Sequence, residues 1–426
     1  MPRARVLVVA ALLVLSARGA ARADGAFPDS LSVLAPADRP RRIALATNFG
    51  LISTNDAGAT WSWVCEGPIT NCSTLYSESA APADRVFALS ADDLVYSDDD
   101  ACTWSVAAGA VAGGGVVDAF PLAEDATRVL AVVSPNGVGA QTAYTVVASS
   151  DDGATFGEVL YTARSGDVVT GVEAARTDPD TIYVTIASAT GFAPLLAITN
   201  DGGTTWRMVD LSPELGQGGI RLIGVDRTNA ARVFLRASLT EAEVLAVFDA
   251  TTDALTMPLA FPGGLMTAFV QTDEGPLVAA GRLNEAGALH RSLDGGATWQ
   301  AVASPPHVRA LAERAGALYA AADDTLDGWA LGVSKDLGLT FTPLMRFADV
   351  GSIAACVRAS CQATCEGEVA IGLWPASTCK AAPEMAPTGQ GGGGCAVGGG
   401  GALGGASLVL AGLALVTRPR TRRRGR

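Results

Sequence analysis

The sequence has few of the side chains that most often carry enzyme chemistry. Its 426 residues include two histidines, His290 and His307, which belong to no common motif. Because histidine is the commonest metal ligand and a frequent general base, this scarcity argues against a histidine-based metal centre or catalytic triad. The chain also lacks a Gly-x-Ser-x-Gly nucleophile elbow and a phosphate-binding P-loop. We therefore predict no catalytic residue, no metal and no cofactor.

Basic residues and helical patterns are scarce as well. Lysine and arginine total 30 against 43 aspartates and glutamates, and the formal net charge is −13. A negative surface repels phosphate backbones, so a nucleic-acid partner is not expected. Residues 24–390 contain no long stretch with amphipathic helical spacing, but many short alternating apolar runs between Gly, Pro and Asp clusters. This pattern is typical of an all-β fold.

Residues 1–23 have the layout of a secretory signal peptide. Arg3 and Arg5 precede the apolar run 6–15, and the small-residue exit Ala21-Arg22-Ala23 follows. We expect cleavage before Asp24 and export of the mature protein. A buried N-terminal helix is the alternative interpretation.

The other end resembles a sorting tail. After a flexible linker over 381–394, residues 395–426 combine Cys395 and further glycines with about fifteen small apolar residues and six arginines. The apolar run is shorter than the roughly 20 residues that a spanning helix needs. The layout is similar to the myxobacterial C-terminal sorting domain, which implies that Cys395 is the processing and anchoring residue. The protein would then contact the membrane through this tail alone, at the outer surface of a Gram-negative envelope or outside the cell; a plain tail anchor is the alternative.

One eight-residue pattern recurs along the chain. It reads Ser/Thr-x-Asp-x-Gly-x-Thr-Trp/Phe and occurs at 54–61, 97–104, 149–156, 199–206, 292–299 and 334–341, with Ala101 replacing the glycine of the second copy. Its aspartates are Asp56, Asp99, Asp151, Asp201, Asp294 and Asp336, and its aromatic residues are Trp61, Trp104, Phe156, Trp206, Trp299 and Phe341. The steps between copies are 43, 52, 50, 93 and 42 residues, and the long step contains a degraded copy at 247–254. Seven units of about 46 residues are typical of propeller blades.

Each unit has the strand content of one blade. A turn and an alternating strand precede each copy by about twenty residues, and the fourth unit shows four strands at 168–174, 181–187, 195–199 and 204–209. Four antiparallel strands make one blade. We therefore predict a seven-bladed β-propeller of four-stranded blades over 24–350, followed by a small cysteine-rich cap over 351–380.

The recurring motif has a structural explanation. The aspartate can accept hydrogen bonds from backbone N–H groups that the turn leaves unpaired, and the glycine adopts a positive φ. The threonine favours the next strand, and the aromatic residue buries apolar area at the seam between blades. Because a catalytic motif would occur once rather than six times, we interpret these residues as structural.

The motif resembles the Asp-box (BNR) repeat of sialidases, sortilin-type receptors, xyloglucan-hydrolysing propellers and a photosystem II assembly factor. The resemblance implies the propeller fold and leaves the function open, because the scaffold serves several functions. A sialidase site would need an arginine triad and a tyrosine nucleophile, and the nearest match to the family's leading motif, residues 41–44, lacks its aromatic residue and proline. A xyloglucanase site lies between two propellers, and this chain has room for one.

The eight cysteines fit an oxidising compartment. Cys65 and Cys72 bracket a short loop and are predicted to pair with each other. Two further bonds, in one of three connectivities, are expected within the cap, among Cys356, Cys361, Cys365 and Cys379. Cys102 then remains, either as a free thiol or as a sign that this pairing is wrong. A zinc site is the alternative for the cap cysteines.

Recognition is expected on the loops that join the second and third strands of each blade. These vary in sequence at 134–142, 188–194, 238–243, 281–287 and 322–329, with Phe192 and Trp329 as candidate exposed aromatic residues. Asp323, Thr325 and Asp327 resemble half of a calcium loop, but Ser334 occupies its twelfth position, which favours a solvated loop. We predict a monomeric, non-catalytic module that binds a glycan, peptide or protein. The alternative is a secreted glycoside hydrolase with an unrecognised carboxylate pair.

Overall fold

The computed structural model describes residues 28–69, 75–80, 84–89, 93–135, 143–283 and 286–380. The predicted signal peptide, linker and sorting tail, together with Cys72 and Cys395, lie outside these residues. Within them, no helix is both long and apolar enough to span a membrane.

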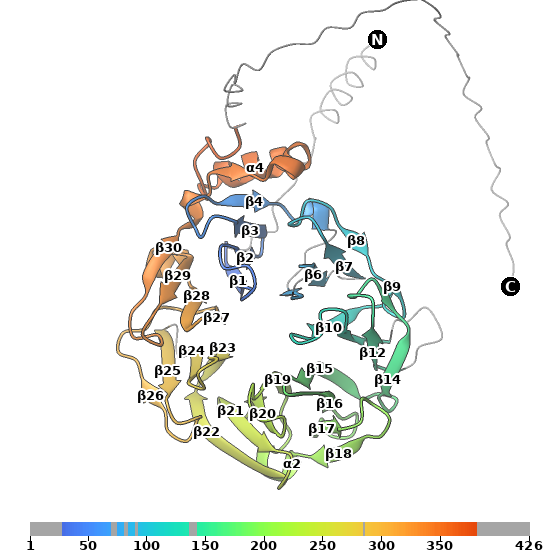
Figure 1. Ribbon diagram of the computed structural model, residues 1–426. Coiled ribbons are helices and arrows are strands. Elements are labelled where there is room, and N and C mark those ends of the chain that lie inside the picture. Colours follow the sequence, from blue (N-terminus) through green and yellow to red (C-terminus); the bar gives the residue numbers. More distant parts are fainter. Residues whose placement is uncertain are drawn as a thin grey trace, which may run out of the picture. The chain divides into compact units, whose positions relative to one another are not determined.

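Seven blades, each containing four antiparallel strands from one segment of the chain, form a closed ring (Figure 1). This confirms the predicted seven-bladed propeller. Blade 1 consists of β1 (Ser30–Leu34), β2 (Ile43–Thr47), β3 (Gly50–Thr54) and β4 (Ser62–Val64). Blade 2 consists of β5 (Leu75–Glu78), β6 (Val86–Leu89), β7 (Leu94–Ser97) and β8 (Ser105–Val106). Blade 3 consists of β10 (Val116–Pro121), β11 (Val129–Val133), β12 (Thr145–Ser149) and β14 (Glu158–Thr162). A short parallel pair, β9 (Ala108–Gly109) and β13 (Thr155–Phe156), lies between blades 2 and 3.

The remaining blades follow the same order. Blades 4 and 5 consist of β15 (Val168–Ala175), β16 (Asp178–Ala187), β17 (Pro194–Thr199) and β18 (Arg207–Asp210); and β19 (Ile220–Val225), β20 (Arg232–Ser238), β21 (Ala242–Asp249) and β22 (Ala254–Pro262). Blades 6 and 7 consist of β23 (Gly264–Gln271), β24 (Leu277–Leu283), β25 (Ala286–Ser292) and β26 (Gln300–Ala301); and β27 (Ala310–Arg314), β28 (Ala317–Ala321), β29 (Leu331–Ser334) and β30 (Thr342–Met345). Short helices α2 (Ser212–Leu215) and α3 (Asp324–Asp327) lie in connecting loops.

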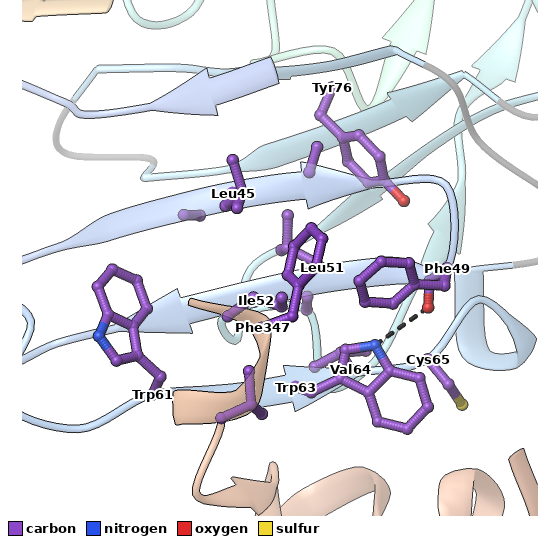
Figure 2. Close-up of a cluster of buried hydrophobic side chains, with 14 of the residues drawn as sticks. Leu45, Phe49, Leu51, Ile52, Trp61, Trp63, Val64, Cys65, Tyr76 and Phe347 are labelled. Atoms are coloured by element: carbon purple, nitrogen blue, oxygen red, sulfur yellow. Dashed lines mark hydrogen bonds between the residues drawn. The ribbon is translucent and has the colours of Figure 1, made fainter. Parts of the chain in front are cut away.

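The hydrophobic core lies between the blades. Every residue of β2, β3, β11 and β12 is buried, because each of these central strands has a neighbouring blade on both faces. Figure 2 shows the cluster around blade 1, where the fully buried Trp63 donates its indole N–H to the Phe49 carbonyl at 3.0 Å. Phe347, which follows blade 7, packs edge-on against Phe49 with ring centroids 5.2 Å apart. This cluster therefore joins the first and last blades.

Each aspartate turn is held by one repeated set of hydrogen bonds. In the last copy, Asp336 Oδ1 accepts the Thr340 N–H at 2.9 Å and the Ser334 hydroxyl at 2.7 Å, and Oδ2 accepts the Thr340 hydroxyl at 2.6 Å. Gly338 has φ +82°, and a Cβ there would lie 2.9 Å from Leu289 of the preceding blade. The same bonds recur at Asp56, Asp99, Asp151, Asp201 and Asp294.

The bonds to Asp336 predict a measurable acid dependence of stability. The Thr340 and Ser334 donors hold the pKa of Asp336 at about 2. A depressed carboxyl pKa stabilises the fold above the unfolded pKa, and this contribution is lost as the pH falls through the folded pKa. Asp336→Ala should therefore lower the free energy of unfolding by about 1 kcal/mol at pH 7, and this difference should shrink between pH 4 and pH 2.

Chemical denaturation of Asp336→Ala and the parent over this pH range tests the expectation. Lys335→Ala, which alters an exposed side chain of the same turn, is the matched control and should match the parent at every pH. A variant difference that stays constant down to pH 2 would show that ionisation of Asp336 is not what stabilises the turn.

The ring is closed by the segment after blade 7. Strand β31 (Ser352–Ile353) pairs in parallel with β4 and becomes a fifth strand of blade 1. Helix α4 (Arg358–Ala370) follows, contacts β31 and lies on the outer side of blade 1 (Figure 1). The sequence analysis did not predict this helix, whose composition is mixed and rich in cysteine.

Three disulfides correct the predicted pairing. Cys65 pairs with Cys361, Cys102 pairs with Cys356, and Cys365 pairs with Cys379. The predicted Cys65–Cys72 bond is therefore wrong, Cys102 is not a free thiol, and one bond rather than two lies within the cap. The physical reason is the path of the C-terminal segment, which brings cap cysteines to Cys65 beside blade 1 and to Cys102 in the β7–β8 turn of blade 2, more than 250 residues earlier in the chain.

Candidate functional site

A cavity of about 260 Å³ opens at one mouth of the central channel. It lies where the first strands of blades 3 to 6, β10, β15, β19 and β23, end and turn into the second strands. This is the face of the ring that carries the aspartate turns, because strand direction alternates within each blade. The cavity is therefore at the opposite end of the channel from the variable loops on which the sequence analysis expected recognition.

The inner wall of the cavity is apolar and aromatic. Phe120, Phe234 and Phe269 contribute rings, and the centroids of the last two are 4.8 Å apart. Gly224 faces these two rings, because a Cβ at that position would make ordinary contacts with Phe234 at 3.7 Å and with Phe269 at 3.8 Å. The wall can therefore hold an apolar group of a ligand.

The rim of the cavity carries two arginines that are already in ion pairs. Arg176 lies 2.5 Å from Glu124 and 3.6 Å from Asp273. Arg227 lies 2.5 Å from Asp273 and 2.8 Å from Glu313, whose side chain is 1% exposed. These pairs join blades 3 to 7 across the mouth, so both guanidinium groups are held by carboxylates.

Glu173 is the carboxyl group that lines the cavity wall below this rim. Its Oε1 accepts the Val225 N–H of the next blade at 2.9 Å. Burial raises the pKa of Glu173 to about 7, against the lowering effects of the Val225 bond and of Arg227. The charge of Asp118 also raises it. Near neutral pH, Glu173 thus exists in both protonation states.

Asp118 is a second channel carboxyl group with a similar environment. Its Oδ2 accepts the Val172 N–H of the next blade at 3.1 Å. The approach is close because position 171 is glycine, where a Cβ would lie 3.2 Å from Oδ2. Burial raises the pKa of Asp118 above its ordinary value. Both carboxyl groups therefore attach an innermost strand to the neighbouring blade.

The predicted site residues lie elsewhere. No aspartate or aromatic residue of the repeated motif lines this cavity. The aromatic residues of the motif pack at the seams, as Trp206 does by donating its indole N–H to the Leu160 carbonyl of the preceding blade at 2.8 Å. Phe192 is 72% exposed, as expected, whereas Trp329 is 7% exposed and stacks on Phe341, so it is no exposed binding residue. Asp323 caps helix α3 by accepting the N–H groups of the next turn.

Sequence reasoning missed the residues of the channel mouth. Glu173 and Asp118 each interrupt an otherwise apolar first strand, VVTGVEAA and VVDAFP. A carboxylate within such a run is the signal that could have found them, because it must face the channel or disrupt the packing between blades. Arg176 follows the end of β15 and Arg227 follows the end of β19, in turns that were interpreted as scaffold.

The chain matches no family model and no curated protein. Among solved structures it is similar to a GH74 xyloglucanase from Xanthomonas campestris, with a TM-score of 0.55 and 16% identity over 76% of this chain and 54% of that one. It is also similar to a GH74 enzyme from Niastella koreensis (TM-score 0.50, 11% identity, 74% and 53% coverage). A puromycin hydrolase gives a TM-score of 0.54 at 13% identity, with 74% and 53% coverage.

These similarities establish the propeller fold alone. The chain spans about half the length of each of these three proteins. At such low identity, the activity of a neighbour does not transfer to this chain.

Proposed function

We propose that this chain is an exported, surface-anchored propeller that binds a ligand at the channel mouth between blades 3 and 6, without catalysing a reaction. The cavity carries this proposal, because it combines an aromatic wall with a polar rim, the composition common to small-molecule sites. The patterns of the two chain ends support export and anchoring. The exposed Phe192 makes the variable-loop face a second contact surface for a large ligand.

The bonding of the carboxylates supports binding over catalysis. The six turn aspartates each use both carboxylate oxygens to accept hydrogen bonds from their own turns, so they cannot readily reach a reacting atom or a water molecule, as a catalytic carboxylate must. Asp118 and Glu173 each accept one backbone N–H from the next blade, which fixes the side chain and leaves its second oxygen for a ligand contact.

Glycoside hydrolysis is the second candidate. One observation favours it: Asp118 and Glu173, on the first strands of neighbouring blades, interact electrostatically and both have raised pKa values, and a carboxyl pair can serve as acid and base. This function requires turnover of an oligosaccharide that is lost in both Asp118→Asn and Glu173→Gln. We expect no turnover by the parent protein.

A cavity-filling variant tests the binding function. Gly224→Leu places a side chain in the cavity from a position where a Cβ makes ordinary contacts. A library of single-ring aromatic compounds, screened by saturation-transfer NMR, should yield ligands of the parent whose affinity falls at least about tenfold in this variant.

The matched control changes a glycine at the other end of the channel. Gly219→Leu has open space around its Cβ and lies near Arg221 and Arg236 rather than at this cavity. It should bind the same compounds as the parent. Equal losses in both variants, or no loss in Gly224→Leu, would contradict binding at this mouth.

A further inference from the structure

We infer that the cavity recognises a primary ammonium group carried on a compact apolar body, with Glu173 as the acceptor of the ammonium hydrogen bond. This inference rests on the proposed binding function and specifies its ligand class. Three features of the described residues support it: the balance of charge at the mouth, the bonding of Glu173 and the size of the apolar wall.

Both arginines at the mouth are already paired with carboxyl groups. Arg176 and Arg227 face four carboxyl groups, which are Glu124, Glu173, Asp273 and Glu313. Each arginine is already within ion-pair distance of two of them. An anionic ligand would have to replace these partners, whereas a cation adds attraction without breaking a pair.

Glu173 offers an acceptor inside the cavity. Its Oε1 is used by the Val225 N–H, and no other hydrogen bond to this side chain occurs within the described part of the chain. Oε2 is then available to an N–H donor of a ligand. A charge-assisted hydrogen bond of this kind is among the stronger polar contacts in proteins.

The apolar wall suits a body of about one ring. An apolar cavity of about 150 Å³ holds a benzene molecule in another protein, and this cavity measures about 260 Å³. The additional volume accommodates a short arm that carries the ammonium group. Phe120 and Phe269 add aromatic surface, which favours a nearby cation further.

Three probes of similar shape and different charge test the inference. Phenethylamine is the cation, 2-phenylethanol is neutral and 3-phenylpropionate is the anion. Titration calorimetry at pH 8 keeps the amine charged and Glu173 ionised, because the pKa of Glu173 is about 7. We expect phenethylamine to bind at least about tenfold more tightly than either of the other probes.

Glu173→Gln identifies the acceptor. The amide oxygen of glutamine can still accept the Val225 N–H, so the fold should be retained, and a melting curve checks this. The affinity for phenethylamine should fall at least about tenfold, while that for 2-phenylethanol should stay within about twofold. Glu214→Gln, a change in the exposed residue of α2 outside the cavity, should leave all three affinities unchanged.

The outcomes separate this inference from the proposed function. If the three probes bind the parent equally and Gly224→Leu abolishes binding, the ammonium inference is overturned and the binding function stands. If no single-ring compound of any charge binds, both fail. The peptide Phe-Gly-Gly and its N-acetylated form distinguish the sources: tighter binding of the free peptide indicates a peptide N-terminus, and binding of phenethylamine alone indicates a free amine.

Discussion

Removal of both long-range disulfides, by Cys356→Ser and Cys361→Ser together, should lower the free energy of unfolding by about 5 kcal/mol. The two bonds join residues 254 and 296 positions apart. In the described chain, the four antiparallel strands of blade 1 and of blade 7 are each consecutive, and the strand pairing that connects the ends of the ring is the short one between β31 and β4. The chain-entropy model assigns about 4.7 kcal/mol to a loop of 100 residues, and these loops are longer.

The single variants and a local control make this test specific. Either single variant leaves one bond to close the ring, and it should cost about 1–2 kcal/mol. The control pair, Cys365→Ser with Cys379→Ser, replaces two buried cysteines, whereas the test pair replaces the buried Cys361 and the exposed Cys356. The control pair opens a loop with a separation of 14 residues inside the cap. Urea denaturation compares the double variant, the two single variants and the control pair with the parent protein. A loss in the control as large as that in Cys356→Ser/Cys361→Ser would show that closure of the ring is not the source of the effect.

Replacement of Arg42 by methionine should lower the free energy of unfolding by about 3 kcal/mol. The Arg42 side chain is 3% exposed, and its Nε lies 2.9 Å from Oε1 of Glu78, which is 6% exposed. It also pairs with Asp100 in the turn of the next blade. Without Arg42, the buried carboxylate of Glu78 keeps Arg39 as a partner but loses one of the two positive charges that offset the cost of its burial.

The equivalent arginine of blade 3 is a matched control. Arg128 also precedes the second strand of its blade, but its ion pair with Asp180 spans 3.5 Å and Asp180 is 66% exposed. Arg128→Met should cost less than about 0.5 kcal/mol. In Arg42→Met, a second change, Glu78→Gln, should restore part of the stability. Equal losses at both arginines, with no restoration, would mean that packing rather than the buried charge pair is responsible.

The fold was predictable because the signal for a blade is a motif of residues that lie close together in the sequence. Asp336 needs partners two and four residues away, so the repeated motif marks each hairpin wherever it occurs. The pairing of Cys65 with Cys361 was not predictable, because it depends on the point at which the ring meets itself. The channel mouth was missed for a similar reason: Glu173, Arg227 and Glu313 meet through the closure of the ring and share no local pattern.

The arrangement of the strands also determines how the number of blades in the ring can change. The four antiparallel strands of each blade come from one stretch of chain. The segment that closes the ring, β31 with α4, follows the last blade. Duplication or loss of one complete unit would therefore leave every other sheet with its own four strands. Such a change would alter the circumference of the ring. The first blade would still adjoin the last one, so β31 could still pair with β4.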